Sequence, residues 1–242
     1  MSRHHEYSQH FLSGPRLIAE LIGHSNIRKN DTVYDLGAGS GVITSVLARR
    51  CKQVVAVEVE QQALKKLRQN VENLENVTII QKDILQLPIP SEPYKIFSNI
   101  PFSLSAEIVR KFTSATNPPK SMYLVAQKQF ARKLVPGSDH FTSQLSAEIS
   151  PWFTVRIRKP LRKTDFTPPP AVDTVLLEIK QRETPIIAPE EAEDYREFVT
   201  LCFTRQKYFI SLEKDKAGLS PELRPSQLTI EQWVRLYATV KA

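Results

Sequence analysis

Short apolar runs alternate with longer amphipathic segments through most of the chain. Between the runs, apolar residues recur at steps of three and four positions, as Leu64, Leu67 and Val71 do, which is typical of a helix with one buried face. Strands that alternate with such helices are typical of a parallel sheet with crossover helices. The sequence therefore predicts an α/β domain. The expected strands are "TVYDLG" from Thr32, "QVVAVEV" from Gln53, "VTIIQKD" from Val77, "YKIFSNI" from Tyr94, "SMYLVAQ" from Ser121, "FTVRIRKPL" from Phe153 and "TVLLEIK" from Thr174.

The strand pattern stops after "KQRETPIIAPEEAED". The two later stretches with helical periodicity are "EDYREFVTLCFTRQKY" and "TIEQWVRLYATV". A change of pattern of this kind indicates a second domain. We therefore predict an α/β domain over residues 1–183 and a small helical domain over residues 184–242.

Composition and charge narrow the class of protein. The 242 residues include 33 Lys and Arg against 26 Asp and Glu, a net charge of +7, which favours a polyanionic partner. The two cysteines, Cys51 and Cys202, lie far apart without metal-ligand spacing, so we expect neither a disulfide framework nor a metal site. No apolar run approaches the ~18 residues of a membrane span, and the start "MSRHHEYSQHF" lacks the apolar core of a signal peptide. We expect a cytoplasmic protein without a membrane partner, and a monomer.

A glycine-rich turn follows the first expected strand. "VYDLGAGSGVITSVLA" places Gly37, Gly39 and Gly41 between that strand and the first helix, where glycine allows the backbone to approach a ligand closely. The spacing G-x-G-x-G differs from the dinucleotide fingerprint G-x-G-x-x-G. Glycines also serve tight turns for purely steric reasons, so the turn alone does not establish a ligand.

Two acidic residues end the next two strands. Glu58 stands where a carboxylate can accept hydrogen bonds from ribose hydroxyls, and Asp83 stands where one can accept an adenine amino hydrogen. The carboxyl ends of parallel strands meet at one crevice. S-adenosylmethionine has an adenine and a ribose but no pyrophosphate. A site with acceptors for ribose and adenine and without the dinucleotide fingerprint therefore suits it better than NAD. The alternative is that both acids are merely solvated strand ends.

The stretch "SNIPFSLS" follows the fourth strand and falls over the same crevice. The side-chain oxygen of Asn99 and a backbone carbonyl beside Pro101 could accept both N–H bonds of an exocyclic base amine, and so turn its lone pair toward a methyl donor. Pro101 keeps Ile100 extended, and Phe102 could stack on the base. The alternative is an ordinary Asn-x-Pro turn with Phe102 in the core.

The ordered set of motifs resembles a known family. "SQHFL", "DLGAGSG", "VEVE", "KDIL", "NIPFSLS" and "DFTPPPAVDTVLLEI" occur in the order and spacing of the S-adenosylmethionine-dependent rRNA adenine N6-dimethyltransferases, over almost the whole chain. The resemblance implies a Rossmann-like methyltransferase sheet with a small α-helical C-terminal domain. It implies the transfer of two methyl groups, one at a time, to N6 of one adenine in ribosomal RNA.

The resemblance also implies roles for single residues. Asn99, with Ile100 and Pro101, would hold the target amine, and Phe102 would stack on the target base. Phe166 would flank the base from a second side, or else cap the sheet before a proline-rich loop. The implied cofactor-binding residues are His10, Leu12, Gly37, Gly39, Gly41, Glu58, Asp83, Ile84 and Asn99.

Two positions depart from the usual pattern of the family. His10 stands where the family usually has Asn, so the contact of this N-terminal lid with the cofactor is made by imidazole or is altered. Phe102 stands where the family often has Tyr, which keeps the stacking face and loses the hydroxyl. Neither change removes a group that the proposed chemistry needs.

Three clusters of positive charge, 127–133, 156–163 and 205–207, could contact an RNA backbone. Each cluster alone could be only a solvated face, and their sum with the net charge supports the RNA interpretation. His4, His5 and Tyr7 could border the entrance for RNA.

The branch within the family is a further prediction. "NIPFSLSAEIVRKF" and the region around "FTVRIRKPLRKTDFTPPP" resemble the Erm type, which acts on 23S rRNA and confers resistance to macrolides, lincosamides and streptogramin B. Enzymes that modify small-subunit (16S) rRNA more often read "NLPY". Three alternatives stay open: a small-subunit enzyme, a DNA adenine methyltransferase, and a non-catalytic RNA-binding or transcription-related relative.

Overall fold

The computed structural model describes residues 10–137 and 141–241. His4, His5 and Tyr7 lie outside the described residues, so their expected place near the RNA stays a prediction.

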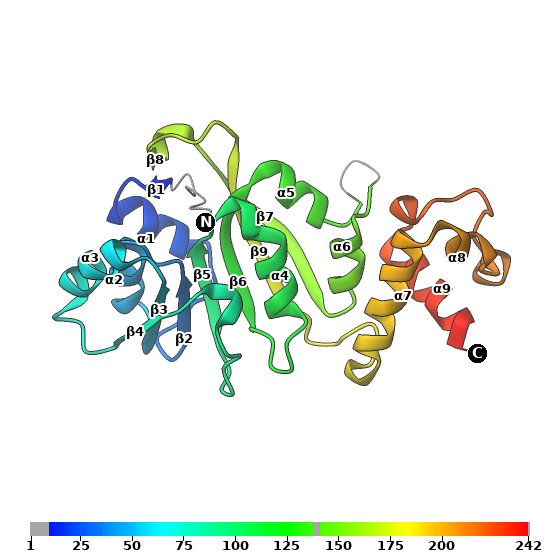
Figure 1. Ribbon diagram of the computed structural model, residues 1–242, viewed down its shortest axis with the longest axis horizontal. Coiled ribbons are helices and arrows are strands. Elements are labelled where there is room, and N and C mark those ends of the chain that lie inside the picture. Colours follow the sequence, from blue (N-terminus) through cyan, green and yellow to red (C-terminus); the bar gives the residue numbers. More distant parts are fainter. Residues whose placement is uncertain (1–9, 138–140, 242) are drawn as a thin grey trace, which may run out of the picture. The chain divides into compact units, whose positions relative to one another are not determined.

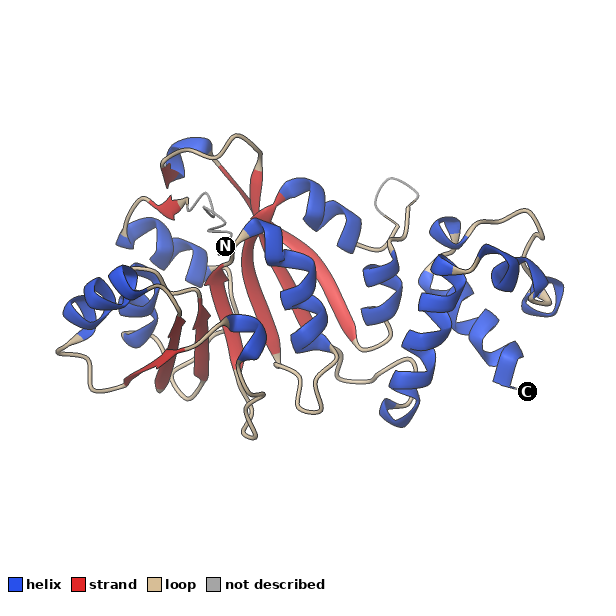
Figure 2. Ribbon diagram, in the orientation of Figure 1, coloured by secondary structure: helices blue, strands red, loops and turns tan. Residues whose placement is uncertain are grey.

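All seven predicted strands are present and form one sheet in the order β4-β3-β2-β5-β6-β9-β7 (Figures 1 and 2). β2 to β6 pair in parallel. β9 runs antiparallel to both of its neighbours. The end of β6 meets the start of β9, where Lys128 N donates to Asp173 O, and the end of β9 meets the start of β7, where Arg182 N donates to Trp152 O. The strands are β2 Thr32–Leu36, β3 Gln53–Glu58, β4 Val77–Gln81, β5 Lys95–Asn99, β6 Ser121–Gln127, β7 Phe153–Leu161 and β9 Thr174–Gln181.

Helices cover both faces of the sheet. Ile18 of α1 (Pro15–Gly23) and Leu47 of α2 (Val42–Ala48) belong to one buried cluster with Val33 of β2. α3 (Gln61–Val71) packs Leu64 and Leu67 against Ala56 of β3. Side chains alternate between the two faces along a strand, so Tyr34, the residue after Val33, points to the opposite face.

That opposite face is covered by α4 (Ser105–Thr113). The ring of Tyr34 lies edge-on to Tyr94 at 5.3 Å, and Tyr94 lies edge-on to Phe112 of α4 at 6.5 Å. The crossover helices therefore place the carboxyl ends of β2 to β5, and the loops that follow them, at one edge of a sheet buried on both faces.

A second, two-stranded sheet was not predicted. β1 (Phe11–Leu12) pairs antiparallel with β8 (Phe166–Thr167), with Phe11 opposite Thr167 and Leu12 opposite Phe166. This pairing attaches the N-terminal segment to the loop before β9.

Contacts within the chain divide it into two compact units, residues 1–129 with 157–179, and residues 130–156 with 180–242. The first unit contains the two-stranded sheet and most of the large one. After β9, the described residues form helices and no strand, and the two predicted helical stretches correspond to α7 with α8 and to α9. The domain boundary at residue 183 stays a prediction.

The remaining helices are short or belong to the second unit. They are η1 Ile84–Gln86, η2 Phe102–Leu104, α5 Lys128–Leu134, α6 Gln144–Ile149, η4 Lys163–Asp165, η5 Pro189–Glu191, α7 Ala192–Thr204, α8 Gln206–Ser211, η6 Lys214–Ala217, η7 Pro225–Gln227 and α9 Ile230–Lys241.

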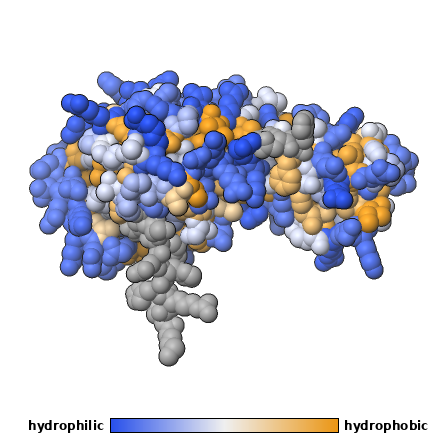
Figure 3. Space-filling view, turned by 90° about the horizontal axis from the view of Figure 1, so that it is seen from above, coloured by the Kyte–Doolittle hydropathy of each residue, from blue (hydrophilic) through white to orange (hydrophobic). Residues whose placement is uncertain are grey.

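The second unit has its own aromatic core. Tyr195 of α7 lies edge-on to Trp152 at 5.6 Å and to Tyr237 of α9 at 5.2 Å, while Phe198 lies against Trp233 at 6.0 Å. The face seen in Figure 3 is mainly hydrophilic, with scattered hydrophobic patches. None of the described helices is both long and apolar enough to span a membrane.

Candidate active site

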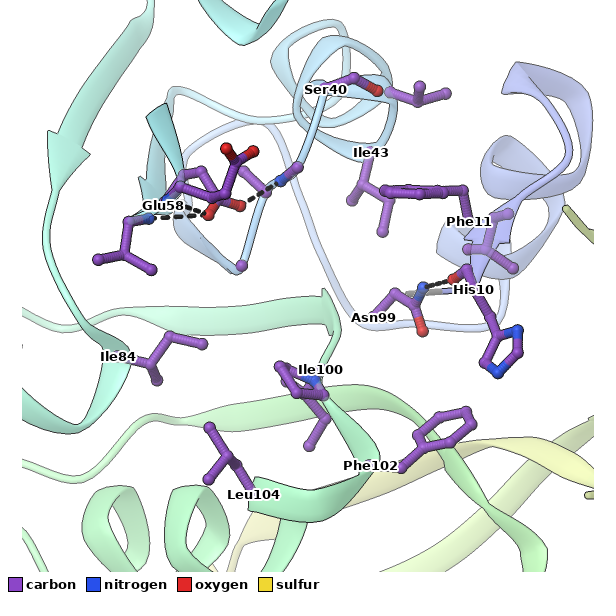
Figure 4. A pocket seen from close by; sticks show the side chains of 18 of the residues that line it. His10, Phe11, Ser40, Ile43, Glu58, Ile84, Asn99, Ile100, Phe102 and Leu104 are labelled. Atoms are coloured by element: carbon purple, nitrogen blue, oxygen red, sulfur yellow. Dashed lines mark hydrogen bonds between the residues drawn. The ribbon is translucent and has the colours of Figure 1, made fainter. Parts of the chain in front are cut away.

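A pocket of about 680 Å³ opens at the carboxyl ends of β2 to β5 (Figure 4). Loops after these four strands line it together with the N-terminal segment around His10. Eleven of the thirteen residues that the sequence assigned to the site line this pocket: His10, Leu12, Gly37, Gly39, Glu58, Asp83, Ile84, Asn99, Ile100, Pro101 and Phe102. The two exceptions are Gly41 and Phe166.

The glycine turn is held against the end of β3. Gly37 N and Ala38 N both donate to Val57 O, at 2.8 and 3.0 Å, and Gly39 N donates to Glu58 Oε2 at 2.8 Å. Gly39 has a φ of 56°, and a Cβ there would lie 3.3 Å from the ring of Phe11. The absence of a side chain at Gly39 therefore lets the N-terminal segment close over the turn.

Gly41 serves packing, and it does not line the pocket. It precedes α2 with a φ of 86°, and a Cβ on it would lie only 2.5 Å from Leu67 Cδ1 of α3. The expectation that Gly41 contacts the cofactor is therefore not supported, because its missing side chain is required by the close approach of α2 and α3.

Glu58 is buried and makes three hydrogen bonds to backbone. Oε2 accepts from Gly39 N, and Oε1 accepts from Val59 N at 2.8 Å and from Glu60 N at 2.9 Å. A carboxylate offers about four acceptor positions, so one further hydrogen bond at Oε2 remains available in this arrangement. Glu58 therefore both fixes the glycine turn and keeps an acceptor at the pocket.

Asp83 presents one unused oxygen. Its Oδ1 accepts from Leu85 N at 2.7 Å and so caps η1, while Oδ2 accepts no hydrogen bond from the described chain. Ile84, next to it, is buried, and its Cδ1 lies 3.6 Å from where a Gly37 side chain would begin. The strand end thus combines an acceptor with an apolar wall, which is what a flat adenine ring requires.

The direction of the Asn99 amide is fixed by one hydrogen bond. Its Nδ2 donates to the backbone oxygen of His10 at 2.6 Å (Figure 4). A carbonyl can only accept, so the amide nitrogen must face His10. The Asn99 Oδ1 lies on the other side of the amide and has no partner within the described chain, so it is available to accept from an amine.

The rest of the tetrad is ordered by local geometry. Pro101 O accepts from Leu104 N at 3.0 Å and begins η2, which leaves the Ile100 carbonyl as the acceptor beside the proline. Phe102 is half-buried, and its ring lies 6.1 Å from that of His10 with planes inclined by 27°. The tetrad forms a turn, as the alternative held, but Phe102 lines the pocket and is not a core residue.

Phe166 does not reach the pocket. It is 2% exposed and belongs to the buried cluster of Leu12, Ile18 and Leu161. Pairing of β1 with β8 turns its side chain into the core. This position fits the alternative role, a cap on the sheet before the proline-rich loop.

Several residues at the site were not anticipated. Phe11 lies over the glycine turn, and Ser98 is fully buried and accepts a hydrogen bond from Leu36 N at 2.6 Å, which ties β5 to β2 below the pocket. Nothing in an apolar strand marks such a serine, since its partner is a backbone group 62 positions away. The remaining unanticipated lining residues are Ile18, Ala38, Ser40, Val42, Ile43, Val59, Glu60, Lys82 and Leu104.

Asp35, in β2 just before the glycine turn, is fully buried. Burial raises its pKa to about 7, opposed by the hydrogen bond that Thr44 Oγ1 donates to Oδ2 at 2.7 Å. Its Oδ1 has no hydrogen-bond partner in the described chain. A neutral carboxyl avoids much of the cost of a buried, half-satisfied charge.

The pocket fits an adenosyl cofactor. Its volume is in the range of small-molecule sites, and its lining combines apolar residues with the acceptors at Glu58 and Asp83. The positive φ of Gly37 and Gly39 opens the turn on the pocket side. Among the described residues, no group of three or more His, Cys, Asp or Glu side chains could hold a metal ion.

Comparisons with known proteins give the family. A model of the family "Ribosomal RNA adenine dimethylase" matches residues 1–220. The mitochondrial ribosomal RNA small subunit methyltransferase of Arabidopsis thaliana is 32% identical over 203 residues, which are 82% of this chain, and this chain spans about half (52%) of that protein. The rRNA adenine N-6-methyltransferase of Lysinibacillus sphaericus is 28% identical over 238 residues, 97% of this chain and 95% of that one.

A solved structure is similar over nearly the whole chain. The 23S rRNA methyltransferase ErmE superposes with a TM-score of 0.81 at 26% identity, covering 96% of this chain and 100% of that one. The chain belongs to the ribosomal RNA adenine dimethylase family, and is an rRNA adenine dimethyltransferase that uses S-adenosylmethionine as its methyl donor.

Proposed function

We propose that the chain methylates N6 of a specific adenine of 23S rRNA, as Erm-type enzymes do, and thereby confers resistance to macrolides, lincosamides and streptogramin B. The observation that carries the chemistry is the Asn99 amide, whose nitrogen is engaged by His10 O and whose oxygen is left open at the pocket. The proposal for the target rests on the comparisons and on the sequence around the tetrad.

The tetrad would orient the amine of the target base. The exocyclic nitrogen of adenine is a poor nucleophile because its lone pair is delocalised into the ring. Asn99 Oδ1 and the Ile100 carbonyl would accept its two N–H bonds, which pyramidalises the nitrogen and directs the lone pair out of the ring plane. Phe102 would hold the base by stacking, worth ~1 to 3 kcal/mol. The proton leaves the nitrogen after transfer, so no strong base is needed in the pocket.

The other half of the pocket would hold the cofactor. S-adenosylmethionine supplies an electrophilic methyl group when bound. Glu58 would accept from its ribose, Asp83 from its adenine, and the backbone around Gly37 would border its methionine part. Lys82 and Glu60 line the same rim. In these assignments the ends of β2, β3 and β4 bind the cofactor, and the end of β5 orients the target amine.

The likeness to ErmE supports the 23S target, since that protein is named a 23S rRNA methyltransferase and the two chains match over nearly their full lengths. The Lysinibacillus relative matches in the same way, with little chain left over on either side. The sequence adds Phe102 at the end of the tetrad, where small-subunit enzymes more often have tyrosine.

A second candidate target is small-subunit rRNA. The Arabidopsis protein, at 32% identity, is named a small subunit methyltransferase, and several bacterial relatives carry the name small subunit methyltransferase A. The family match gives no support to the alternatives of a DNA methyltransferase or a non-catalytic relative. A cytoplasmic location and a monomeric state stay predictions.

The test is to incubate the purified chain with labelled S-adenosylmethionine and either protein-free 23S rRNA or small ribosomal subunits, and to map the modified adenine by primer-extension stops. We expect label and a single stop in 23S rRNA. Stops confined to the small-subunit RNA would replace the first target by the second, and label in neither RNA would refute both.

A further inference from the structure

We propose that the imidazole of His10 forms the second wall of the slot for the target adenine, opposite Phe102. The inference rests on the proposed function, which gives Phe102 the role of stacking on that base. It differs from the sequence-based expectation, which gave His10 to the cofactor and the second wall to Phe166.

The two rings already face each other. Their centroids lie 6.1 Å apart and their planes are inclined by only 27°. Both side chains are half-buried and line the same pocket, and both rings lie near Asn99 (Figure 4). Asn99 is the residue that would hold the amine, so a base in contact with it lies next to both rings.

His10 is held in this position from two directions. Its Nδ1 lies 2.9 Å from Pro168 O, and since a carbonyl only accepts, Nδ1 is the donor and carries a hydrogen. Its own backbone oxygen accepts from Asn99 Nδ2 at 2.6 Å. The next residue, Phe11, pairs with Thr167 in the two-stranded sheet. The ring is therefore anchored relative to the tetrad and the proline-rich loop.

The spacing suits a slot that opens slightly on binding. A base stacked between two rings needs about 3.5 Å on each side, or about 7 Å between the ring planes. The centroids are 6.1 Å apart, and the gap between the planes cannot exceed this distance, so the rings must separate by at least about 1 Å. Rotation of the half-buried Phe102 side chain can supply this shift, and it leaves both hydrogen bonds of His10 in place. Phe166 is buried in the core and leaves the place opposite Phe102 to His10.

The test compares variants of His10 in steady-state methylation of whichever ribosomal RNA the wild-type chain modifies. His10→Asn can still donate a hydrogen bond to Pro168 O but has no ring, and His10→Phe has a ring but no donor. We expect His10→Asn and His10→Ala to raise KM for RNA about tenfold, with kcat and the calorimetric Kd for S-adenosylmethionine nearly unchanged. His10→Phe should keep KM close to the wild-type value.

His24→Ala, a substitution of a histidine at the end of α1 outside the pocket, is the matched control and should change none of these quantities. A wild-type KM in His10→Asn, or a loss of cofactor affinity in place of RNA affinity, would overturn the proposal and return His10 to the cofactor lid. Phe102→Ala in the same assay distinguishes a failure of the second wall from a failure of base stacking as a whole. If Phe102→Ala raises KM for RNA and His10→Asn does not, His10 is not a wall of the base slot, but Phe102 still is. If neither variant changes KM, stacking on the target base is refuted as well.

Discussion

At the scale of single residues, the site depends on polar groups whose direction is set by a backbone partner. Asn99 is aimed by His10 O, and Glu58 is aimed by three backbone N–H groups. Because these polar groups already point in the required direction, they need not reorient when a substrate binds, and this preorganisation makes polar groups effective in an active site. The same contacts explain why Glu58 is tolerated at 6% exposure.

Asp35 gives a prediction about stability and pH. Its pKa is about 7 in the folded chain and near 3.8 when unfolded, so the folded state binds more protons between those values. The stabilisation that a neutral Asp35 provides is complete below pH ~4 and is lost as pH rises through 7. Asp35→Asn keeps an acceptor for Thr44 and carries no charge, so its free energy of unfolding relative to wild type should increase by ~2 kcal/mol between pH 5 and pH 8.

Urea denaturation of both proteins at the two pH values measures this difference. Asp173→Asn, at an exposed carboxylate, controls for the substitution itself. A gap between wild type and Asp35→Asn that stays constant with pH would show that Asp35 does not titrate in this range.

At the scale of elements, the sequence predicted the strands and helices that have a regular pattern of apolar residues. All seven strands of the large sheet and the late helices were correct, because long apolar runs and helical spacing reflect burial directly. β1 and β8 were missed, since two-residue strands have no periodicity and their pairing joins Leu12 to Phe166 across the chain. The same missing contact explains why Phe166 could be taken for a pocket residue.

The sequence predicted which residues line the pocket better than it predicted the contacts that each of them makes. Most assigned residues meet there because the carboxyl ends of parallel strands converge, a rule that needs only strand order. Gly41 could not be told from Gly39 by spacing, since what separates them is the position of Leu67 on a neighbouring helix.

The glycine turn yields a prediction with an internal control. Gly41 and Gly218 both have φ in the left-handed region, 86° and 67°, but a side chain at Gly41 meets Leu67 at 2.5 Å while one at Gly218 meets nothing within 4 Å. Gly218→Ala should lose about 1 kcal/mol of stability from backbone strain alone. Gly41→Ala should lose ~1–3 kcal/mol more from overpacking.

Thermal or urea unfolding of the two variants gives the comparison. Equal losses would mean that α2 and α3 separate without cost, and would remove the packing explanation for Gly41.

At the scale of the whole molecule, much of the positive charge near the predicted RNA contacts is already paired. In the cluster 156–163, Arg158 lies 3.8 Å from Glu178, Lys159 contacts Glu20, and Arg162 lies 3.2 Å from Asp165. Arg156 is exposed and has no ion-pair partner in the described chain. Cations without an internal partner are the ones best able to replace the counterions of an RNA backbone.

Two residues of β7 test this distinction. Arg156→Gln should weaken binding to ribosomal RNA and lower the slope of log affinity against log salt by about one contact, ~0.7 to 0.9. Lys159→Gln should change the slope less, because its ammonium is held by Glu20. A salt titration of RNA binding measures both, and a larger effect of Lys159 would contradict the assignment.

The pocket as a whole divides into two halves that meet above the sheet. The ends of β2, β3 and β4 supply the glycine turn, Glu58 and Asp83, and the end of β5 supplies the tetrad. We propose that the first half binds S-adenosylmethionine while Asn99 orients the amine of the target adenine, so that one substitution can separate the two activities.

The most direct measurement is made on Asn99→Ala, by calorimetric titration with S-adenosylmethionine and by initial rates of methyl transfer to ribosomal RNA. We expect a Kd within about threefold of wild type and a transfer rate lower by a factor of about 100 or more, comparable to the loss of one hydrogen-bonding group that acts at the reacting atom. Parallel loss of cofactor binding and transfer, or a transfer rate close to that of wild type, would contradict the proposal.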